Sequence, residues 1–251
     1  MLDPLSDPLA IFAVCLGLFL GGILKGATGA GMPVLAVPII AAILDVRLAV
    51  ITLVLPNFLV NAVQIWKYFR HNAEPAFALK FAFAGMIGAG IGTWFLARLP
   101  TEQLTIAIVV IIVAYILLRV AKPTLKLPLE IAQSLAWPAG IGGGILQGTV
   151  GLSAPIAVTF ANAVRLDRPV FIFTVSVFFA AMCLAQIPML LAYDLMSWKV
   201  AMISAMSLPP LFLGVAVGER MGGILDAQTF DRLILGLLAL LALVQLYGLV
   251  F

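Results

Sequence analysis

Apolar segments of membrane-spanning length recur along the chain and leave little else to fold. The chain is 64% hydrophobic and only 10% charged, whereas soluble domains carry about 25% charged residues. The segments run for about 15–25 residues, the length of a helix that crosses a hydrocarbon core about 30 Å thick. Strand-like alternation is missing. We therefore predict an all-α, multi-pass membrane protein that sits in a lipid bilayer.

Ten helical segments are predicted, separated by breaks that hold glycine, proline and nearly all the charges. They cover about 9–24, 32–44, 48–66, 76–97, 102–120, 130–146, 154–164, 168–192, 198–217 and 227–250. The polar stretch Lys122 to Glu130 divides the chain into an N-terminal half (1–121), a cytoplasmic linker (122–129) and a C-terminal half (130–251).

The two halves are predicted to be repeats of one another. A shift of 122 residues superposes Gly22, Gly26, Gly29, Pro33 and Gln64 on Gly144, Gly148, Gly151, Pro155 and Gln186. Near the ends of the halves a shift of 126 pairs Gly88 with Gly214 and Gly92 with Gly218. Each half has five segments, an odd number, so the second half should enter the membrane with the opposite polarity. This predicts an inverted repeat, the architecture of many secondary transporters.

The distribution of basic residues fits that topology. With alternating segments, one face collects Lys67, Arg70, Lys80, Arg119, Lys122, Lys126, Arg165, Arg168, Arg220 and Arg232, and the other collects Arg47, Arg98 and Lys199. The positive-inside rule makes the first face cytoplasmic. We expect a bacterial-type inner (plasma) membrane protein with both termini outside.

The first two segments of each half are shorter than the roughly 20 residues that a full span needs. The pairs 9–24/32–44 and 130–146/154–164 are either strained spans or re-entrant hairpins that reach mid-membrane. We favour the hairpin, because glycine-rich irregular backbone is tolerated at membrane depth only where it is buried in protein or lines a cavity.

The first break reads LGGILKGATGAGMPVLAVP, and it carries the candidate binding residues Lys25, Gly26, Thr28, Gly29 and Gly31. The second break offers Gln147, Gly148, Thr149, Gly151 and Ser153. In each copy a proline follows, which suits the first turn of a helix. Helix starts with free N–H groups bind anions, and Lys25 would add charge. Two other interpretations stay open: the glycines only let helices pack closely, and Lys25 snorkels to the interface.

A row of polar side chains in segment 48–66 shares one helical face. Its members are Thr52, Asn57, Asn61 and Gln64, and Gln186 matches Gln64 across the repeat. They either line a substrate pocket or join helices through hydrogen bonds. We place Asn57, Asn61, Gln64 and Gln186 in the predicted site.

Several functions are disfavoured by what the sequence lacks. All eleven acidic residues lie at segment ends or in loops, whereas proton relays and cation sites usually carry a carboxylate within the membrane. Motifs for a serine nucleophile, a zinc site or a nucleotide-binding loop are missing. The net charge of +3 reflects topology rather than nucleic-acid binding. We expect no enzyme, no metal and no cofactor.

The paired lines GGILKGATGAGMPVLAVP and GGILQGTVGLSAPIAV resemble the TauE/SafE sulfite exporter family of membrane transporters, over essentially the whole chain. The resemblance implies a secondary transporter for sulfur-containing or organic anions such as sulfite, sulfoacetate and other sulfonates. It makes Lys25–Pro33 and Gln147–Pro155 the signature residues. The second copy departs from the first at Ser153-Ala154, where the first has Gly31-Met32.

From the residues and the resemblance together we predict a transporter of a small sulfur oxyanion that works by alternating access, with proton coupling through the substrate itself. The alternatives are a passive channel for anions or small solutes and a non-transporting membrane scaffold. A homodimer is compatible with the sequence, but no segment marks an interface.

Overall fold

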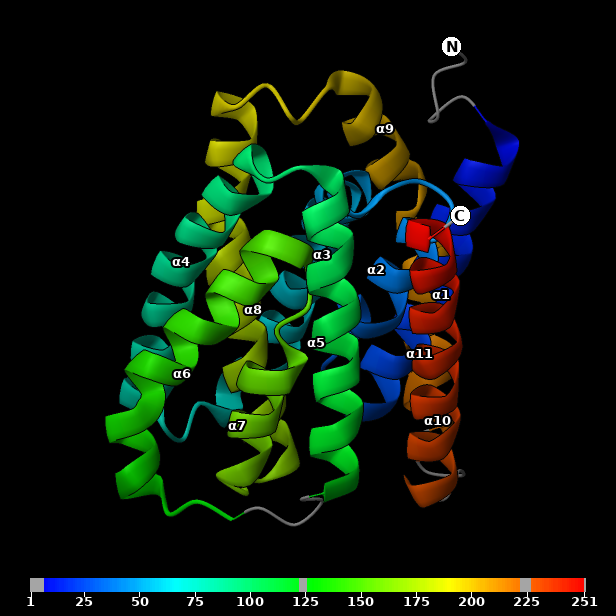
Figure 1. Cartoon of the computed structure of the whole chain (residues 1–251). Helices are drawn as coiled ribbons and strands as arrows, with labels where there is room; N and C mark the ends of the chain where they lie inside the picture. Colours follow the sequence, from blue (N-terminus) through cyan, green and yellow to red (C-terminus); the bar gives the residue numbers. More distant parts are fainter. Residues whose placement is uncertain (1–6, 122–125, 222–226, 251) are drawn as a thin grey trace.

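The fold is a bundle of helices, seen in a computed structural model that describes residues 7–121, 126–221 and 227–250 (Figure 1). In chain order the α-helices are α1 (Pro8–Thr28), α2 (Met32–Ala41), α3 (Val46–Tyr68), α4 (Pro75–Arg98), α5 (Thr101–Ala121), α6 (Leu129–Val150), α7 (Thr159–Ala163), α8 (Arg168–Ala192), α9 (Trp198–Met206), α10 (Leu208–Met221) and α11 (Ala227–Val250). Two short helices, η2 (Phe69–His71) and η3 (Ala154–Val158), complete it. The described residues contain no strand.

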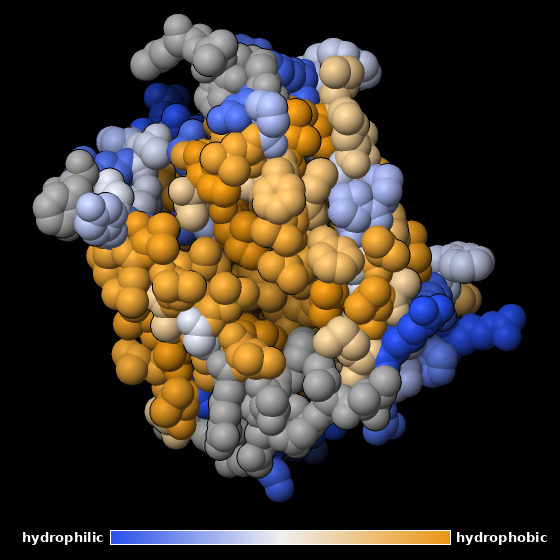
Figure 2. All heavy atoms as spheres, turned by 90° about the vertical axis from the view of Figure 1, so that its right-hand side faces the viewer, coloured by the Kyte–Doolittle hydropathy of each residue, from blue (hydrophilic) through white to orange (hydrophobic). Residues whose placement is uncertain are grey.

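Six helical stretches among the described residues are long and apolar enough to cross a membrane. They are Pro8–Thr28, Val46–His71, Pro75–Arg98, Thr101–Ala121, Arg168–Ala192 and Trp198–Met221. Figure 2 shows apolar side chains over the middle of one face and hydrophilic ones toward its upper and lower ends. Exposed leucines such as Leu117 and Leu240 are what a lipid-facing surface requires. The prediction of an all-α, multi-pass membrane protein is confirmed.

The first helix of each half is longer than predicted. The segments predicted at 9–24 and 130–146 extend to Thr28 and Val150, which gives helices of 21 and 22 residues. Each ends at a glycine in the left-handed conformation: Gly29 has φ 85° and Gly151 φ 74°. The prediction that these two segments are short is therefore wrong. Helix α1 continues through Lys25 because the ammonium group is hydrogen-bonded inside the bundle and does not need to reach water.

The second segment of each half is short, as predicted. Helix α2 has ten residues, and the equivalent stretch Ala154–Ala163 begins as a π-helix. The segment predicted at 198–217 is divided at Ser207 into α9 and α10. Part of the predicted linker, 122–125, lies outside the described residues.

Two helix pairs are joined by glycine. Helix α1 packs along α10, and α4 packs along α6. A methyl group at Gly22 or Gly26 would collide with the backbone of α10, and one at Gly144 or Gly148 with the backbone of α4. Glycine is required at these positions because the two backbones touch.

Helices α3 and α8 lie against each other in the interior and run antiparallel. Gln64 meets Ser176, and Asn57, earlier in α3, meets Cys183, later in α8. Stacking of Phe81 on Phe178, with ring centroids 4.1 Å apart, holds α4 against the same helix. The polar face of α3 is thereby buried at the centre of the bundle.

The ends of the helices alternate between the two ends of the bundle. The start of α1 and the end of α11 lie toward the upper end in Figure 1, and the connection from α5 to α6 lies at the lower end. The starts of α4, α8 and α11 lie toward that lower end.

Candidate functional site

The first glycine-rich break is a tight turn between α1 and α2. Gly29 and Gly31 both have φ 85°, a conformation that glycine adopts without steric cost. The Thr28 hydroxyl lies 2.8 Å from the carbonyl oxygens of both Leu24 and Ala30 and can donate to either. It also accepts a 3.3 Å bond from the Ala30 N–H. These local bonds hold the turn, and they use one of the backbone donors that was predicted to be free for an anion.

Lys25 lies one turn before the end of α1 and is 1% exposed. Its ammonium group donates a 2.9 Å hydrogen bond to Asn61 Oδ1 on α3. It also lies 5.8 Å from the centre of the Phe179 ring on α8, within range of a cation–π contact. Lys25 therefore does not snorkel in this structure; it points into the protein.

A chain of amides continues from Lys25 across to α8. Asn61 Nδ2 lies 2.9 Å from Asn57 Oδ1 and 2.6 Å from the Asn57 carbonyl oxygen. Asn57 Nδ2 in turn donates to Cys183 Sγ at 3.6 Å. The spacing of four residues between Asn57 and Asn61 puts both side chains on one face of α3, so the predicted row is continuous here.

The positive charge of Lys25 is not neutralised by a neighbouring acid. Among the described residues the one ion pair is Lys67 with Glu219 at 2.7 Å, near the ends of α3 and α10. A buried ammonium group without a counter-ion is costly, and an anion that enters the site would offset that cost. Lys25 is the only Lys, Arg, Asp or Glu among the buried residues of the described part of the chain.

The two matched glutamines occupy different environments. Gln64 Oε1 accepts a 2.8 Å bond from the Ser176 hydroxyl. Gln186 is 1% exposed, and neither its oxygen nor its nitrogen has a partner. Thr52, at the opposite end of the α3 row from Gln64, also has an unpartnered buried hydroxyl. Buried amides are normally paired, so Gln186 offers unused donors and acceptors to a ligand or a water.

The second break also carries unpartnered polar atoms. The Gln147 Oε1 and Ser153 Oγ atoms are buried without a partner. Gly151 faces Val37 and Val50, which leave no room for a methyl group. Thr149 instead bonds the Gly92 carbonyl at 3.3 Å, toward α4. Gln147 thus sits where the repeat aligns it with Lys25, in a neutral and largely apolar setting.

The structure brings some predicted site residues together and leaves others apart. Lys25, Asn57 and Asn61 form one bonded chain, whereas Gln64 and Gln186 lie elsewhere along α3 and α8. Gly26 and Gly148 lie in the contacts of α1 with α10 and of α6 with α4.

Sequence reasoning did not include Cys183 or Phe179 in the site. A signal for Cys183 was present, because the 122-residue shift that relates the halves equates Asn61 with Cys183. The contact of Phe179 with Lys25 had no comparable signal, because a phenylalanine in an apolar helix looks like any other core residue.

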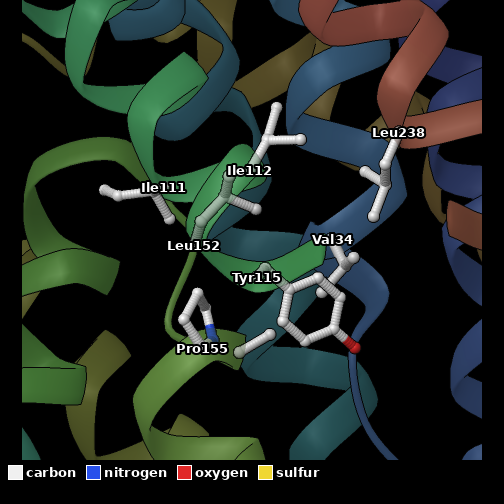
Figure 3. Close-up of a pocket in the computed structure, with 8 residues that line it drawn as sticks. Val34, Ile111, Ile112, Tyr115, Leu152, Pro155 and Leu238 are labelled. Carbon is white, nitrogen blue, oxygen red and sulfur yellow. The ribbon is translucent and has the colours of Figure 1, made fainter. Parts of the chain in front are cut away.

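A small apolar pocket lies between α2, α5, α11 and the second break (Figure 3). It is lined by Val34, Ile111, Ile112, Tyr115, Leu152, Ala154, Pro155 and Leu238. Its volume is about 10 Å³, close to the smallest space that holds a single water. This pocket is too small and too apolar to bind an oxyanion.

A family model described as Sulfite exporter TauE/SafE matches residues 14–244. The chain belongs to the TauE/SafE family. The TauE/SafE match spans both glycine-rich breaks and the helices that carry Asn57, Asn61 and Cys183. Comparisons with curated proteins and with solved structures gave no match.

Membership in TauE/SafE confirms the resemblance read from the paired glycine-rich lines. It assigns the chain to a family of membrane transporters, in agreement with the six membrane-spanning stretches. A TauE/SafE transporter is also consistent with the prediction that the chain is not an enzyme.

Proposed function

We propose that this protein is a secondary transporter that moves a small sulfur oxyanion, of the sulfite, sulfonate or sulfoacetate class, across a bacterial-type plasma membrane. Lys25 attracts the anion, and Asn57 and Asn61 orient it. Gln147, Ser153 and Gln186 supply further polar contacts as the site rearranges. The family description names sulfite export, and the buried lysine supports an anion of that kind.

The single observation that carries this proposal is the burial of Lys25 without a carboxylate partner. Ionisable residues inside membrane segments are expensive, and they mark substrate or ion pathways. A scaffold would need the glycine contacts of α1 and α6, but it would gain nothing from an uncompensated charge at its centre. A replaceable anion accounts for both the charge and its lack of a fixed partner.

The inverted repeat is part of the proposal, and the packing supports it. The N-terminal half contributes α1 and α4, whose partners α10 and α6 belong to the other half. The shifts in residue number that equate Gly26 with Gly148 and Gly92 with Gly218 map α1 onto α6 and α4 onto α10. They therefore map the pair α1–α10 onto the pair α6–α4.

Alternating access then follows from the movement of these pairs. Backbone-to-backbone glycine contacts make α1–α10 one rigid unit and α4–α6 another. We propose that the two units rock about α3 and α8, so the moving bodies are not the two sequence halves. In this proposal the transported anion itself carries the coupled proton. Both termini face outward, as the distribution of basic residues predicts.

Uptake of sulfur-radiolabelled sulfite into vesicles that contain the purified protein tests the proposal. We expect saturable uptake that is stimulated by sulfite on the opposite side, which a passive channel would not show. Lys25→Met should lose this uptake, and the matched control Lys126→Met, in the exposed connection before α6, should keep it. Normal folding and full sulfite uptake by Lys25→Met would contradict the role of the lysine.

Binding can be tested separately through thermal stability. A ligand at a hundredfold excess over its Kd stabilises the folded state by about 2.7 kcal/mol. Sulfite, sulfate, thiosulfate, sulfoacetate, taurine and acetate form a panel that ranks the anion class. Stabilisation by a neutral or cationic solute, with none by any anion, would overturn the proposal.

A further inference from the structure

A basic pocket opens where α1 ends and α8 begins, at the end of the bundle that the charge distribution assigns to the cytoplasm. Its volume is about 260 Å³, far above the 10–15 Å³ that holds one water. Thr28, Asn162, Arg165 and Arg168 provide its polar lining. Two arginines, a threonine and an asparagine therefore line one open space.

The two arginines differ in how they are held. Arg168 donates a 2.9 Å hydrogen bond to the Ala27 carbonyl oxygen in the last turn of α1, so its position is fixed relative to the first break. Arg165 is exposed, and its guanidinium group has no hydrogen-bond or ion-pair partner among the described residues, although its backbone N–H donates to the Asn162 carbonyl oxygen at 3.2 Å. Asp167 lies between them in the chain, but it forms no ion pair with either arginine. The positive charge of the pocket is thus available to a ligand.

A second pocket of about 60 Å³ continues inward from the first and shares Thr28 and Asn162 with it. This inner pocket reaches Gly31 in the turn of the first break and Leu24, the neighbour of Lys25 in α1. Arg119 contributes from α5. The two pockets therefore meet at Thr28 and Asn162, and the inner one borders the turn that ends the lysine-bearing helix.

We infer that this basic pocket is an outer anion-binding site, in which a small oxyanion such as sulfite binds before it reaches Lys25. The inference rests on the proposed transport function, since Lys25 is its inner destination. Guanidinium groups bind tetrahedral and pyramidal oxyanions through paired N–H donors. The Asn162 amide can complete the shell.

Arg165 also provides a variant that separates binding from folding. It has φ 59°, in the left-handed region, immediately after the last turn of α7, where glycine is the usual residue. A non-glycine residue in this conformation is strained. Arg165→Gly relieves that strain and removes the guanidinium group, so loss of binding in this variant cannot be assigned to a poorer fold.

The experiment measures equilibrium binding of sulfur-radiolabelled sulfite to the purified full-length protein in the Lys25→Met background, where the inner site is disabled. We expect residual, salt-sensitive sulfite binding that weakens at least tenfold in Lys25→Met/Arg165→Gly. The matched control is Arg98→Gln, which removes an exposed arginine at the end of α4 and should leave binding unchanged. Equal binding with and without Arg165 would overturn the inference.

Competition identifies the source of the oxyanion. Displacement of sulfite by sulfate supports a site for soluble anions. Displacement by a short-chain phosphatidylglycerol, with none by sulfate, would assign the pocket to a lipid headgroup and overturn the inference. Because this assay lacks Lys25, its outcome is independent of sulfite uptake: absence of uptake by the wild-type protein contradicts the proposed transport, and absence of Arg165-dependent binding contradicts the outer site.

Discussion

The two glycine-rich breaks follow the same sequence pattern, yet one follows a lysine and has an exposed Thr28, and the other follows a glutamine and has a buried Val150 at the equivalent position. The first break follows Lys25 and borders a basic pocket. The second follows Gln147 and borders the small apolar pocket and, through Ala154, the inner pocket of about 60 Å³. The two breaks share a glycine and proline pattern but are surrounded by different side chains. These side chains decide which break admits a polar solute.

The difference in exposure between the two breaks bears on the proposed alternating-access cycle. The basic pocket lies at the exposed Thr28 of the first break, whereas the equivalent Val150 of the second break is buried. A transporter with a single central site needs one side open while the other is sealed. For the proposed transporter, we expect the anion to enter from the side of the exposed Thr28.

The largest effect is expected from moving the charge from one break to the other. Lys25→Gln makes the first break as neutral as the second and should reduce sulfite uptake on the order of a hundredfold, since loss of one partner in a buried charge pair costs 2–5 kcal/mol. The added substitution Gln147→Lys should restore part of the uptake if the two positions are equivalent. Uptake by Lys25→Gln at the wild-type rate would remove the distinction between the breaks.

Glycine substitutions should affect both breaks equally, in contrast to the charge. Gly26→Ala and Gly148→Ala each force a methyl group into a neighbouring backbone, and overpacking of this kind costs about 1–3 kcal/mol. Both variants should unfold at a lower temperature in detergent. Gly236→Ala on α11 has open space around it and serves as the control that keeps its stability. Loss of stability at Gly26 alone would contradict the reciprocal packing of α1–α10 and α4–α6.

Thiol labelling should sharpen the distinction between open and closed. In a variant without Cys15 and Cys183, Thr28→Cys borders the basic pocket and should react with a membrane-impermeant thiol reagent from the predicted cytoplasmic side. Val150→Cys, the equivalent position in the second break, is buried and should stay unlabelled. Equal labelling at both positions, read out by mass spectrometry, would show that the breaks do not differ in access.

The smallest effect is expected from the ion pair that connects the two halves at the surface. Lys67 and Glu219 are 48% and 39% exposed at the side chain, and surface ion pairs contribute about 0–1 kcal/mol. Glu219→Gln should shift thermal stability only slightly, and the shift should vanish at high salt. A large loss of stability would mean that this bridge, rather than the glycine contacts, holds α10 in place.

Sequence patterns predicted the membrane helices and part of the site, because both depend on local periodicity. Asn57 and Asn61 share a face of α3 at a spacing of four, and Lys25 stands out in an apolar segment. The lengths of α1 and α6 were underestimated, since a lysine or a glycine inside an apolar run looks like a boundary. Whether the helix continues depends on a partner, Asn61 for Lys25, that is 36 residues away in the chain.

The role of individual glycines was beyond sequence reasoning for a related reason. Gly26 and Gly29 are three residues apart, yet one touches the backbone of α10 and the other supplies a left-handed turn. Close approach and unusual φ are both met by the same residue type. Only the arrangement of the neighbouring helices separates the two causes.

The exchange of helix partners has a consequence for assembly. Helix α1 finds its glycine-fitted partner in α10, and α6 finds its own in α4, so neither half can complete its packing from its own residues. The two halves therefore pack against each other as the subunits of a heterodimer do, although they belong to one chain. If the chain were severed in the connection between α5 and α6, the two fragments should recover function only when they are produced together. Their yield should then rise with their density in the bilayer, as for any bimolecular association.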